Sequence, residues 1–295
     1  MLDGKVAVIT GASSGIGASL ARLLAKEHAA VVLAARRKDK LESLARQITT
    51  EGGRAIPIRC DVTVREDAEQ LIHDAVQEFG RIDILINNAG RGHFAAVEDT
   101  TDDVMEKMFA VNVFPLWYTT RPALPLMKKQ RSGHIINIAS MAGKVGYPYN
   151  SAYVAAKHAC VGFTMALRQE LFETGVHASV VCPAGVLTEW ALATEGGSML
   201  EFFSESGPAI KRIAAERKLR LPQIEGVLPP DAIAQRILEC IYKPVAEVYT
   251  HTGSKEFATL ALQNREESEQ MQVAVVLGER EVYERMKKRG NGVVE

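Results

Sequence analysis

Short apolar runs alternate with amphipathic segments along most of the chain. Between the runs, the spacing of apolar residues predicts helices at 18–28, 39–51, 64–79, 101–113 and 151–171. The runs have the length of buried strands, and they cover residues 5–10, 30–35, 55–60, 82–87, 134–139, 176–182 and 246–250. Strands separated by helices of this length indicate right-handed β-α-β crossovers. We therefore predict an α/β fold with helices on both faces of a doubly wound parallel sheet.

Glycine and polar residues follow several of these strands. Ligands of a parallel sheet bind beyond the carboxyl ends of the strands, which is where residues 11–17, Asp61, residues 87–90 and Ser140 fall. The glycine-rich turn at 11–17 opens a helix, and backbone N–H groups at a helix N-terminus suit a phosphate. Its glycine spacing differs from the commoner Gly-x-Gly-x-x-Gly pattern, so a purely structural turn is the alternative. Asp61 could accept from an adenine amino group or cap the next helix.

Tyr153 and Lys157 are four residues apart in a segment rich in helix formers, so both side chains should leave one face of a helix. An ammonium close to a phenol favours the phenolate, and we expect Lys157 to lower the pKa of Tyr153 from its usual value of about 10. Ser140 follows the run at 134–139 and could steady a substrate oxygen. Tyrosine and lysine one turn apart also occur on ordinary helices, so the pair alone does not establish an active site.

The segment from 189 to 229 contains no strand pattern and carries large apolar residues such as Trp190 and Phe202. Such an insertion after a strand predicts a substrate lid. Its basic residues could receive an anionic substrate group, or they could form a solvated helix face. We expect one dinucleotide-binding and catalytic domain at 1–253 and a helical extension at 254–295. Within the extension we expect two charged helices joined near Leu277 and Gly278, without site chemistry.

Two helical segments have features that bear on assembly. Pro115 lacks an N–H, which predicts either a kink beside Asn112 or a helix that ends near Asn112, followed by one with Pro115 in its first turn. The segment at 151–172 is apolar on nearly every side, which implies burial beyond one sheet face. We expect residues 112–127 and 151–172 to form the main interface of a homodimer or homotetramer.

Composition limits the class of function. The 295 residues are 47% apolar and carry a formal net charge of -1, so no global charge favours nucleic acid or anionic lipid as a partner. The four cysteines form no Cys-x-x-Cys pair and the histidines have no metal-ligand spacing, so we expect free buried thiols and no metal. The first strand begins by Lys5, which leaves no room for a signal peptide, and no run has the length of a membrane span. Cytoplasm is the expected location, with no membrane partner.

Several short motifs occur in one order on this α/β pattern. They are Thr10-Gly-x-x-x-Gly-x-Gly17, Asn87-Asn-Ala-Gly90, Asn112, Ser140, Tyr153-x-x-x-Lys157 and Pro183-Ala-Gly-Val-Leu-Thr188. Together, from about Gly4 to Thr250, they resemble the short-chain dehydrogenase/reductase superfamily. The resemblance implies a Rossmann fold with a seven-stranded parallel sheet and a nicotinamide dinucleotide across the strand ends. Ala184 stands where the family usually has glycine, and the tail beyond Thr250 is longer than usual.

The resemblance also implies roles for particular residues. Tyr153 would be the general acid/base, and Lys157 would lower its pKa and bind the nicotinamide ribose. Ser140 would hold the substrate oxygen, and Asn112 would support a proton relay through water and Lys157. Residues 61 and 62 would contact the adenine, and residues 186 and 188 would orient the carboxamide. The full set of expected cofactor-binding residues is Gly11, Ser13, Ser14, Gly15, Ile16, Gly17, Arg36, Arg37, Asp61, Val62, Asn88, Ala89, Gly90, Tyr153, Lys157, Pro183, Val186 and Thr188.

The end of the second strand bears on cofactor choice. A carboxylate there would bond the ribose 2′-hydroxyl of NAD and repel the 2′-phosphate of NADP, but this chain has Ala35. Arg36 and Arg37 follow, and a guanidinium offers a planar fork of donors that suits a phosphate. We expect NADP(H) to be preferred, with Arg36 as the main contact and Arg37 free to stack on adenine or face water. Arginines that are merely solvated are the alternative.

The leading hypothesis is an NADP(H)-dependent oxidoreductase that acts on a carbonyl or secondary alcohol, on a substrate that is partly apolar. The alternatives are an NAD(H)-preferring dehydrogenase of the same family and a catalytically silent NADP(H)-binding sensor or scaffold. The combination of Asn112, Ser140, Tyr153 and Lys157 argues against the silent protein, because a binding module needs no tuned phenol. The absence of metal-ligand spacing in the sequence argues against a zinc-dependent dehydrogenase.

Overall fold

A computed structural model describes residues 1–191, 194 and 199–289 of the chain. Its centre is a seven-stranded sheet in which all neighbouring strands are parallel, in the order β3-β2-β1-β4-β5-β6-β7. The strands are β1 (Val6–Thr10), β2 (Ala30–Ala35), β3 (Arg54–Arg59), β4 (Ile84–Asn87), β5 (Gly133–Ile138), β6 (Val176–Cys182) and β7 (Glu247–Tyr249). The predicted doubly wound, Rossmann-like sheet is confirmed.

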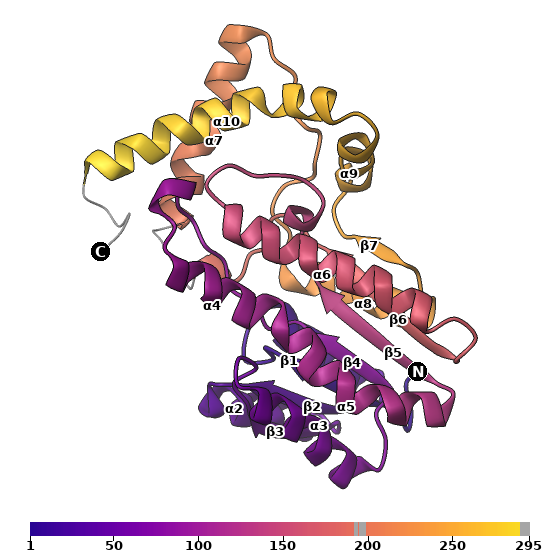
Figure 1. The fold of residues 1–295 in the computed structure, drawn as a ribbon. Coiled ribbons are helices and arrows are strands. Elements are labelled where there is room, and N and C mark those ends of the chain that lie inside the picture. The colour runs from indigo at the N-terminus through magenta and orange to yellow at the C-terminus, as the bar shows by residue number, and fades with distance from the viewer. Residues whose placement is uncertain (192–193, 195–198, 290–295) are drawn as a thin grey trace.

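Helices cover both faces of the sheet (Figure 1). One core lies between the sheet and α1 (Gly15–Lys26), α2 (Lys38–Thr50) and α8 (Pro230–Tyr242). The opposite core lies against α3 (Arg65–Phe79), α5 (Phe114–Gln130) and α6 (Ser151–Glu170). Successive residues of β1 alternate between the two cores, because side chains of a strand point to opposite faces. The strand runs are apolar throughout for this reason.

Residues 112–115 follow the second of the two sequence alternatives. α4 (Asp102–Asn112) ends at Asn112, and α5 begins at Phe114 with Pro115 in its first turn. Proline is tolerated there because the first-turn N–H groups of a helix have no intrahelical partner. Asn112 therefore sits at a helix end rather than at a kink, with its side chain buried.

The extension does not divide where the sequence suggested. α9 (Ser254–Gln263) and α10 (Arg265–Lys288) are separated at Asn264, and α10 runs unbroken through Gly278. The Asn264 side chain accepts from the backbone N–H of Glu267 and so caps α10. Glycine at 278 serves close packing instead, because a Cβ atom there would lie 2.7 Å from Ile210 of α7 (Met199–Arg217).

Helix α10 of the extension packs against α7, the helix of the expected lid segment (Figure 1). Tyr283 of α10 stacks on Tyr149 with ring centroids 4.2 Å apart, and its hydroxyl donates to Asp99 over 2.8 Å. Phe94 and Phe202 complete this aromatic cluster, with their centroids 4.1 Å apart. Within the described residues, no helix combines the length and apolar character that crossing a membrane requires.

Candidate active site

Tyr153 and Lys157 leave the same face of α6, as the four-residue spacing predicted, and both are buried. The Lys157 ammonium lies over the Tyr153 ring, 5.7 Å from its centroid, and donates to the Ile138 carbonyl over 2.9 Å. That carbonyl is at the carboxyl end of β5. The lysine therefore ties the tyrosine-bearing helix to the edge of the sheet where ligands bind.

The pKa of Tyr153 differs from the expectation. Burial raises it to about 12, while a hydrogen bond from the Ser140 hydroxyl lowers it. The Lys157 ammonium is directed at the Ile138 carbonyl and lies over the Tyr153 ring. Burial likewise lowers the pKa of Lys157 itself. The expected net lowering of the Tyr153 pKa is therefore wrong for the protein alone, and Tyr153 is protonated at neutral pH.

Ser140 follows β5 and is the N-cap of the short 3-10 turn η2 (Met141–Gly143). Its hydroxyl oxygen accepts from the Ala142 N–H over 3.1 Å, which fixes the side chain. The same hydroxyl reaches Tyr153. Serine and tyrosine, thirteen residues apart in sequence, thus meet at the strand end.

Asn112 and Lys157 converge on Gly90, just beyond β4. The Asn112 amide donates to the carbonyls of Arg91 and Met108 over 3.0 and 2.9 Å, and its oxygen accepts from the Arg91 N–H over 3.3 Å. A Cβ atom on Gly90 would lie 2.8 Å from the Asn112 oxygen and 3.4 Å from the Lys157 nitrogen. Glycine is needed here because two polar side chains approach the backbone closely.

The glycine-rich turn joins β1 to α1 at the same edge of the sheet. Gly11 and Gly15 have positive φ angles of 66° and 54°, which glycine adopts without strain. Asn88 binds the turn to the end of β4 by donating to the Thr10 carbonyl over 2.9 Å. Ser14 is the N-cap of α1 but makes no side-chain capping bond. The first-turn N–H groups of α1 are therefore not capped by Ser14.

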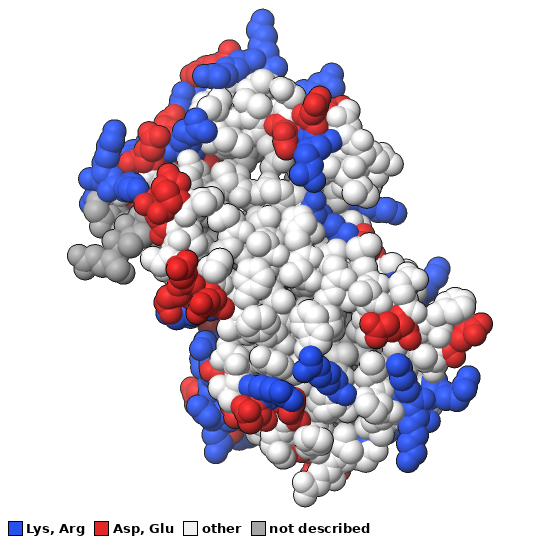
Figure 2. All heavy atoms as spheres, in the orientation of Figure 1, with Lys and Arg blue, Asp and Glu red and all other residues white. Residues whose placement is uncertain are grey.

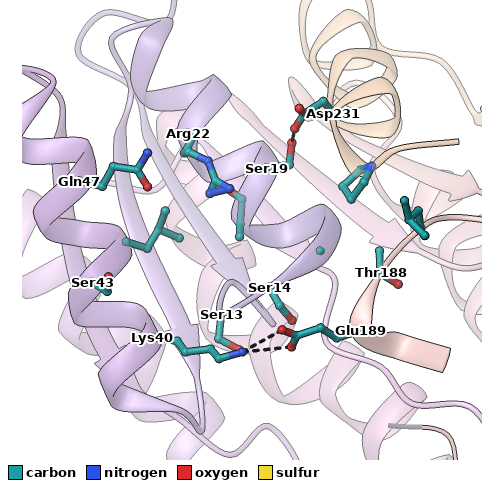
Figure 3. A pocket seen from close by; sticks show the side chains of 15 residues that line it. Ser13, Ser14, Ser19, Arg22, Lys40, Ser43, Gln47, Thr188, Glu189 and Asp231 are labelled. Atoms are coloured by element: carbon teal, nitrogen blue, oxygen red, sulfur yellow. Dashed lines mark hydrogen bonds and ion pairs between the residues drawn. The ribbon is translucent and has the colours of Figure 1, made fainter. Parts of the chain in front are cut away.

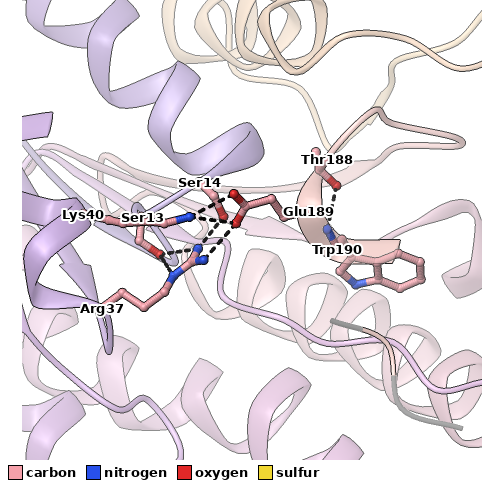
Figure 4. Close-up of polar contacts among 7 residues, drawn as sticks. All are labelled: Ser13, Ser14, Arg37, Lys40, Thr188, Glu189 and Trp190. Carbon is pink, nitrogen blue, oxygen red and sulfur yellow. Dashed lines mark hydrogen bonds and ion pairs between the residues drawn. The ribbon is translucent and has the colours of Figure 1, made fainter. Parts of the chain in front are cut away.

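Arg37 is exposed, as one of its two expected alternatives had it, and it is also held by neighbouring side chains. Its guanidinium donates to the hydroxyls of Ser13 and Ser14 over 2.9 and 2.8 Å. It also pairs with Glu189 over 2.8 Å, across the mouth of the glycine-rich turn (Figure 4). Arg36 is exposed, and its guanidinium has no hydrogen-bond or ion-pair partner within the described part of the chain. Both arginines lie directly after β2, as predicted.

The remaining expected cofactor residues surround this edge. Asp61 makes a local turn, because its carboxylate accepts from both the N–H and the hydroxyl of Thr63. Neither bond caps the following helix, α3, whose N-cap is Val64 and has no side-chain cap, and the adenine role of Asp61 stays a prediction. The backbone of Pro183 accepts from the Met141 N–H over 2.8 Å. Thr188 approaches Gly15, where a Cβ atom would lie 3.0 Å from its methyl group. The loop after β6 thus lies against the glycine-rich turn.

A groove of about 760 Å³ lies on the outer side of this turn, between α1, α2 and the start of α8 (Figure 3). Lys40, Gln47 and Glu189 are among the residues that line it, while Tyr153 and Ser140 are not. This groove and the candidate catalytic residues are therefore separate features.

Trp190 covers the candidate catalytic tyrosine. Its ring lies 5.3 Å from the Tyr153 ring, and a Cβ atom on Gly92 would lie 2.3 Å from it. Phe94 and Tyr149 pack in the aromatic cluster beside Trp190. Tyr153 thus has an aromatic neighbour from the expected lid segment.

Two carboxyl groups with unusual surroundings were not predicted from the sequence. Glu189 offered no signal, because its partner Arg37 is 152 residues away in sequence. Glu279 was detectable, since it falls on the buried stripe that runs through Gln272, Val282 and Met286 of α10. It is 8% exposed, and burial raises its pKa to about 8. The Glu279 carboxyl group also raises the pKa of the neighbouring Tyr147, after the larger effect of burial.

The family model described as "short chain dehydrogenase" matches residues 5–195. This match covers the glycine-rich turn, Ser140, Tyr153 and Lys157 in one continuous stretch. The chain belongs to the short-chain dehydrogenase family. The resemblance in the sequence motifs is confirmed, and the protein is a member of an oxidoreductase family.

Relatives of known name are consistent with that assignment. The ketoacyl reductase HetN of a Nostoc species is 34% identical over 84% of this chain and 78% of its own length. An uncharacterized oxidoreductase of Staphylococcus aureus is 42% identical over 64% of this chain and 80% of its own length. Both relatives are oxidoreductases by name.

Solved structures of the same fold contain nicotinamide nucleotides. A short-chain dehydrogenase/reductase from Burkholderia phymatum in complex with NAD is 28% identical, with a TM-score of 0.78 over 90% of this chain and 95% of that one. An alcohol dehydrogenase from Thermococcus sibiricus, complexed with 5-hydroxy-NADP, is 28% identical, with a TM-score of 0.70 over 84% of this chain and 96% of that one.

Proposed function

We propose that this protein is an NADP(H)-dependent oxidoreductase that interconverts a carbonyl group and a secondary alcohol, with Tyr153 as the general acid/base. The observation that carries the proposal is the buried phenol of Tyr153, hydrogen-bonded by Ser140 and on one helix face with Lys157, at the carboxyl edge of a parallel sheet. Family membership supports the reaction class. The relatives solved with NAD or a NADP derivative support a nicotinamide cofactor.

The residues at the strand ends fit a dinucleotide. Ser14 leaves the first turn of α1 uncapped, so its N–H groups would hold the pyrophosphate. Lys157, beside Gly90, would hold the nicotinamide ribose, with Asn112 fixing the chain around that glycine. Val186 and Thr188 would orient the carboxamide from the loop after β6. The cofactor, when bound, supplies or accepts the hydride.

The chain's own residues would handle the proton. In reduction, Ser140 would bind the carbonyl oxygen and Tyr153 would donate its proton to that oxygen. A phenol with a pKa of about 12 is protonated at neutral pH, which suits a proton donor. In alcohol oxidation the same group must first lose its proton. Asn112 and Lys157 would then support a relay that returns a proton to the tyrosine.

Tyr153→Phe is expected to lose about 10²- to 10⁴-fold in carbonyl reduction while cofactor binding stays within about twofold, because the change deletes one hydroxyl and keeps the ring. Steady-state rates with a panel of ketones and fluorescence titration of the cofactor measure the two effects. Tyr118→Phe is the matched control, since it removes a phenol hydroxyl on α5 beside Arg65. Near-normal turnover of Tyr153→Phe would contradict the assignment and favour a silent binding protein.

The preference for NADP(H) rests on the end of β2. Ala35 offers no carboxylate to repel a 2′-phosphate, and Arg36 is exposed and unpaired within the described residues. Arg37 is already fixed at the glycine-rich turn by Ser13 and Ser14. Two guanidinium groups beside the expected ribose position favour a phosphate there.

We expect kcat/KM to favour NADPH over NADH by about ten- to hundredfold, which corresponds to about 1.5–3 kcal/mol for a charge-assisted bond. Ala35→Asp with Arg36→Ser should move the preference toward NADH, because the new carboxylate binds the 2′-hydroxyl and one cation is lost. Lys38→Ser, which removes an exposed cation at the first residue of α2, is the control. A parent that prefers NADH, or a double variant with an unchanged ratio, would show that these residues do not read the 2′ position.

The assembly is also a proposal. α5 and α6 form a face on which large apolar side chains are exposed, among them Phe114, Trp117 and Met165. Figure 2 shows few charged residues in the central part of this face. Trp117 also packs edge-on against Phe163, with centroids 4.4 Å apart, which joins the two helices into one surface. An apolar surface of this kind suits a second copy of the chain.

Light scattering at micromolar concentration is expected to give a dimer or a tetramer. Trp117→Glu with Met165→Glu should shift the mass toward the monomer, because two charges would be buried in the interface. Leu262→Glu is the control, since Leu262 is 87% exposed on α9, outside the proposed face. A monomeric parent protein would reject this interface.

A further inference from the structure

Glu189 joins the loop after β6 to the connection between β2 and α2. It begins the 3-10 turn η3 (Glu189–Ala191), directly after Thr188, and reaches toward the connection between β2 and α2. Its two carboxylate oxygens pair with Arg37 over 2.8 Å and with Lys40 over 2.9 Å (Figure 4). These bonds hold the pKa of Glu189 at about 2, so the carboxylate is charged at neutral pH.

The side chains of Arg37 and Lys40, together with the hydroxyl groups of Ser13 and Ser14, form a site that suits one anion. Arg37 donates to Ser13 and Ser14 as well as to Glu189, which holds its fork at the mouth of the glycine-rich turn. Lys40 approaches the same carboxylate from the first turns of α2. The site lies two residues beyond Ala35, the end of β2, where the adenosine ribose of a dinucleotide lies in this kind of fold.

We propose that Glu189 is a specificity-determining residue that competes with the 2′-phosphate of NADP(H) for Arg37 and Lys40. The inference rests on the proposed function, because it assumes that a dinucleotide binds at this strand edge. A 2′-phosphate must displace the carboxylate, whereas the 2′-hydroxyl of NAD(H) leaves the ion pairs intact. Glu189 therefore reduces the preference for NADP(H) that the two arginines create.

Displacement of the Glu189 carboxylate by a 2′-phosphate should cost little free energy. Arg37, Lys40 and Glu189 are all more than two-fifths exposed, and ion pairs between exposed side chains are weak. A phosphate dianion carries more charge than a carboxylate and offers more acceptor oxygens to the same donors. The 2′-phosphate can thus replace the Glu189 carboxylate. The affinity for NADP(H) is lowered because the ion pairs of Glu189 with Arg37 and Lys40 must first break.

Replacement of Glu189 by the phosphate should also alter the surroundings of Tyr153. Glu189 and Trp190 are consecutive, and the Trp190 N–H donates to the Thr188 hydroxyl over 3.3 Å. The Trp190 ring lies 5.3 Å from that of Tyr153. Release of Glu189 from Arg37 and Lys40 therefore frees the turn that places Trp190 over the active site. NADP(H) and NAD(H) would leave this ring in different environments.

Calorimetric titration with two nucleotides separates the effects. Adenosine 2′,5′-bisphosphate carries the 2′-phosphate, and 5′-AMP lacks it. Glu189→Gln keeps the side-chain size and removes the charge, so it should raise the affinity for the bisphosphate about three- to tenfold and change that for AMP by less than twofold. The gain should shrink in high salt, because exposed charges are screened. Glu216→Gln, which breaks an exposed pair with Arg212 on α7, should change neither affinity.

Tryptophan emission gives a second readout. In the parent protein the bisphosphate should change the emission and AMP should not, because only the bisphosphate displaces Glu189 beside Trp190. In Glu189→Gln the two nucleotides should give the same spectrum. The second tryptophan, Trp117, lies on α5 and is common to every comparison.

Equal gains for both nucleotides in Glu189→Gln would overturn the proposal, since they would indicate general opening of the cleft. An unchanged or weaker affinity for the bisphosphate would also overturn it, as would an equal gain in Glu216→Gln. In each of these outcomes the nucleotides still bind, so the proposed function stands. If neither nucleotide binds the parent or any variant, the proposed function fails and the inference fails with it.

Discussion

The burial of two polar side chains on one face of α6 is the constraint on which the site depends. Tyr153 and Lys157 are 8% and 5% exposed, and a buried phenol or ammonium needs partners. Ser140 supplies a partner to the tyrosine, and the Ile138 carbonyl supplies one to the lysine. Both partners come from the carboxyl end of β5, so satisfying the two side chains also fixes the helix against the strand end.

A buried chain of amides and hydroxyls holds this edge in register below the site. Asn87 at the end of β4 donates to Asn137 of β5 over 2.9 Å, and Asn137 donates to Thr164 of α6 over 2.9 Å. Thr119 of α5 donates to Asn87 over 2.8 Å. The network joins two strands to the two helices that we propose as the subunit interface. Assembly and active-site geometry would thus be linked through fully buried hydrogen bonds.

The sheet and the candidate catalytic residues were predictable because they follow from local patterns and fixed spacing. The pKa of Tyr153 was not, since burial depends on elements far apart in sequence. The pairing of Arg37 with Glu189 joins residues 152 positions apart and has no local signature. The break in the extension was misplaced because Gly278 looked like a helix end. Only the packing of α7 shows why glycine stays inside α10, while Asn264 supplies the cap.

The central claim is that Tyr153 transfers the proton and that Ser140 lowers its pKa against the effect of burial. The most direct test is the pH dependence of alcohol oxidation in the parent and in Ser140→Ala. Oxidation needs deprotonated Tyr153, so the rate should rise with pH toward the pKa of the phenol. Loss of the Ser140 hydrogen bond raises that pKa, and the rising limb should move to higher pH. A limb that stays in place or moves to lower pH would contradict the account.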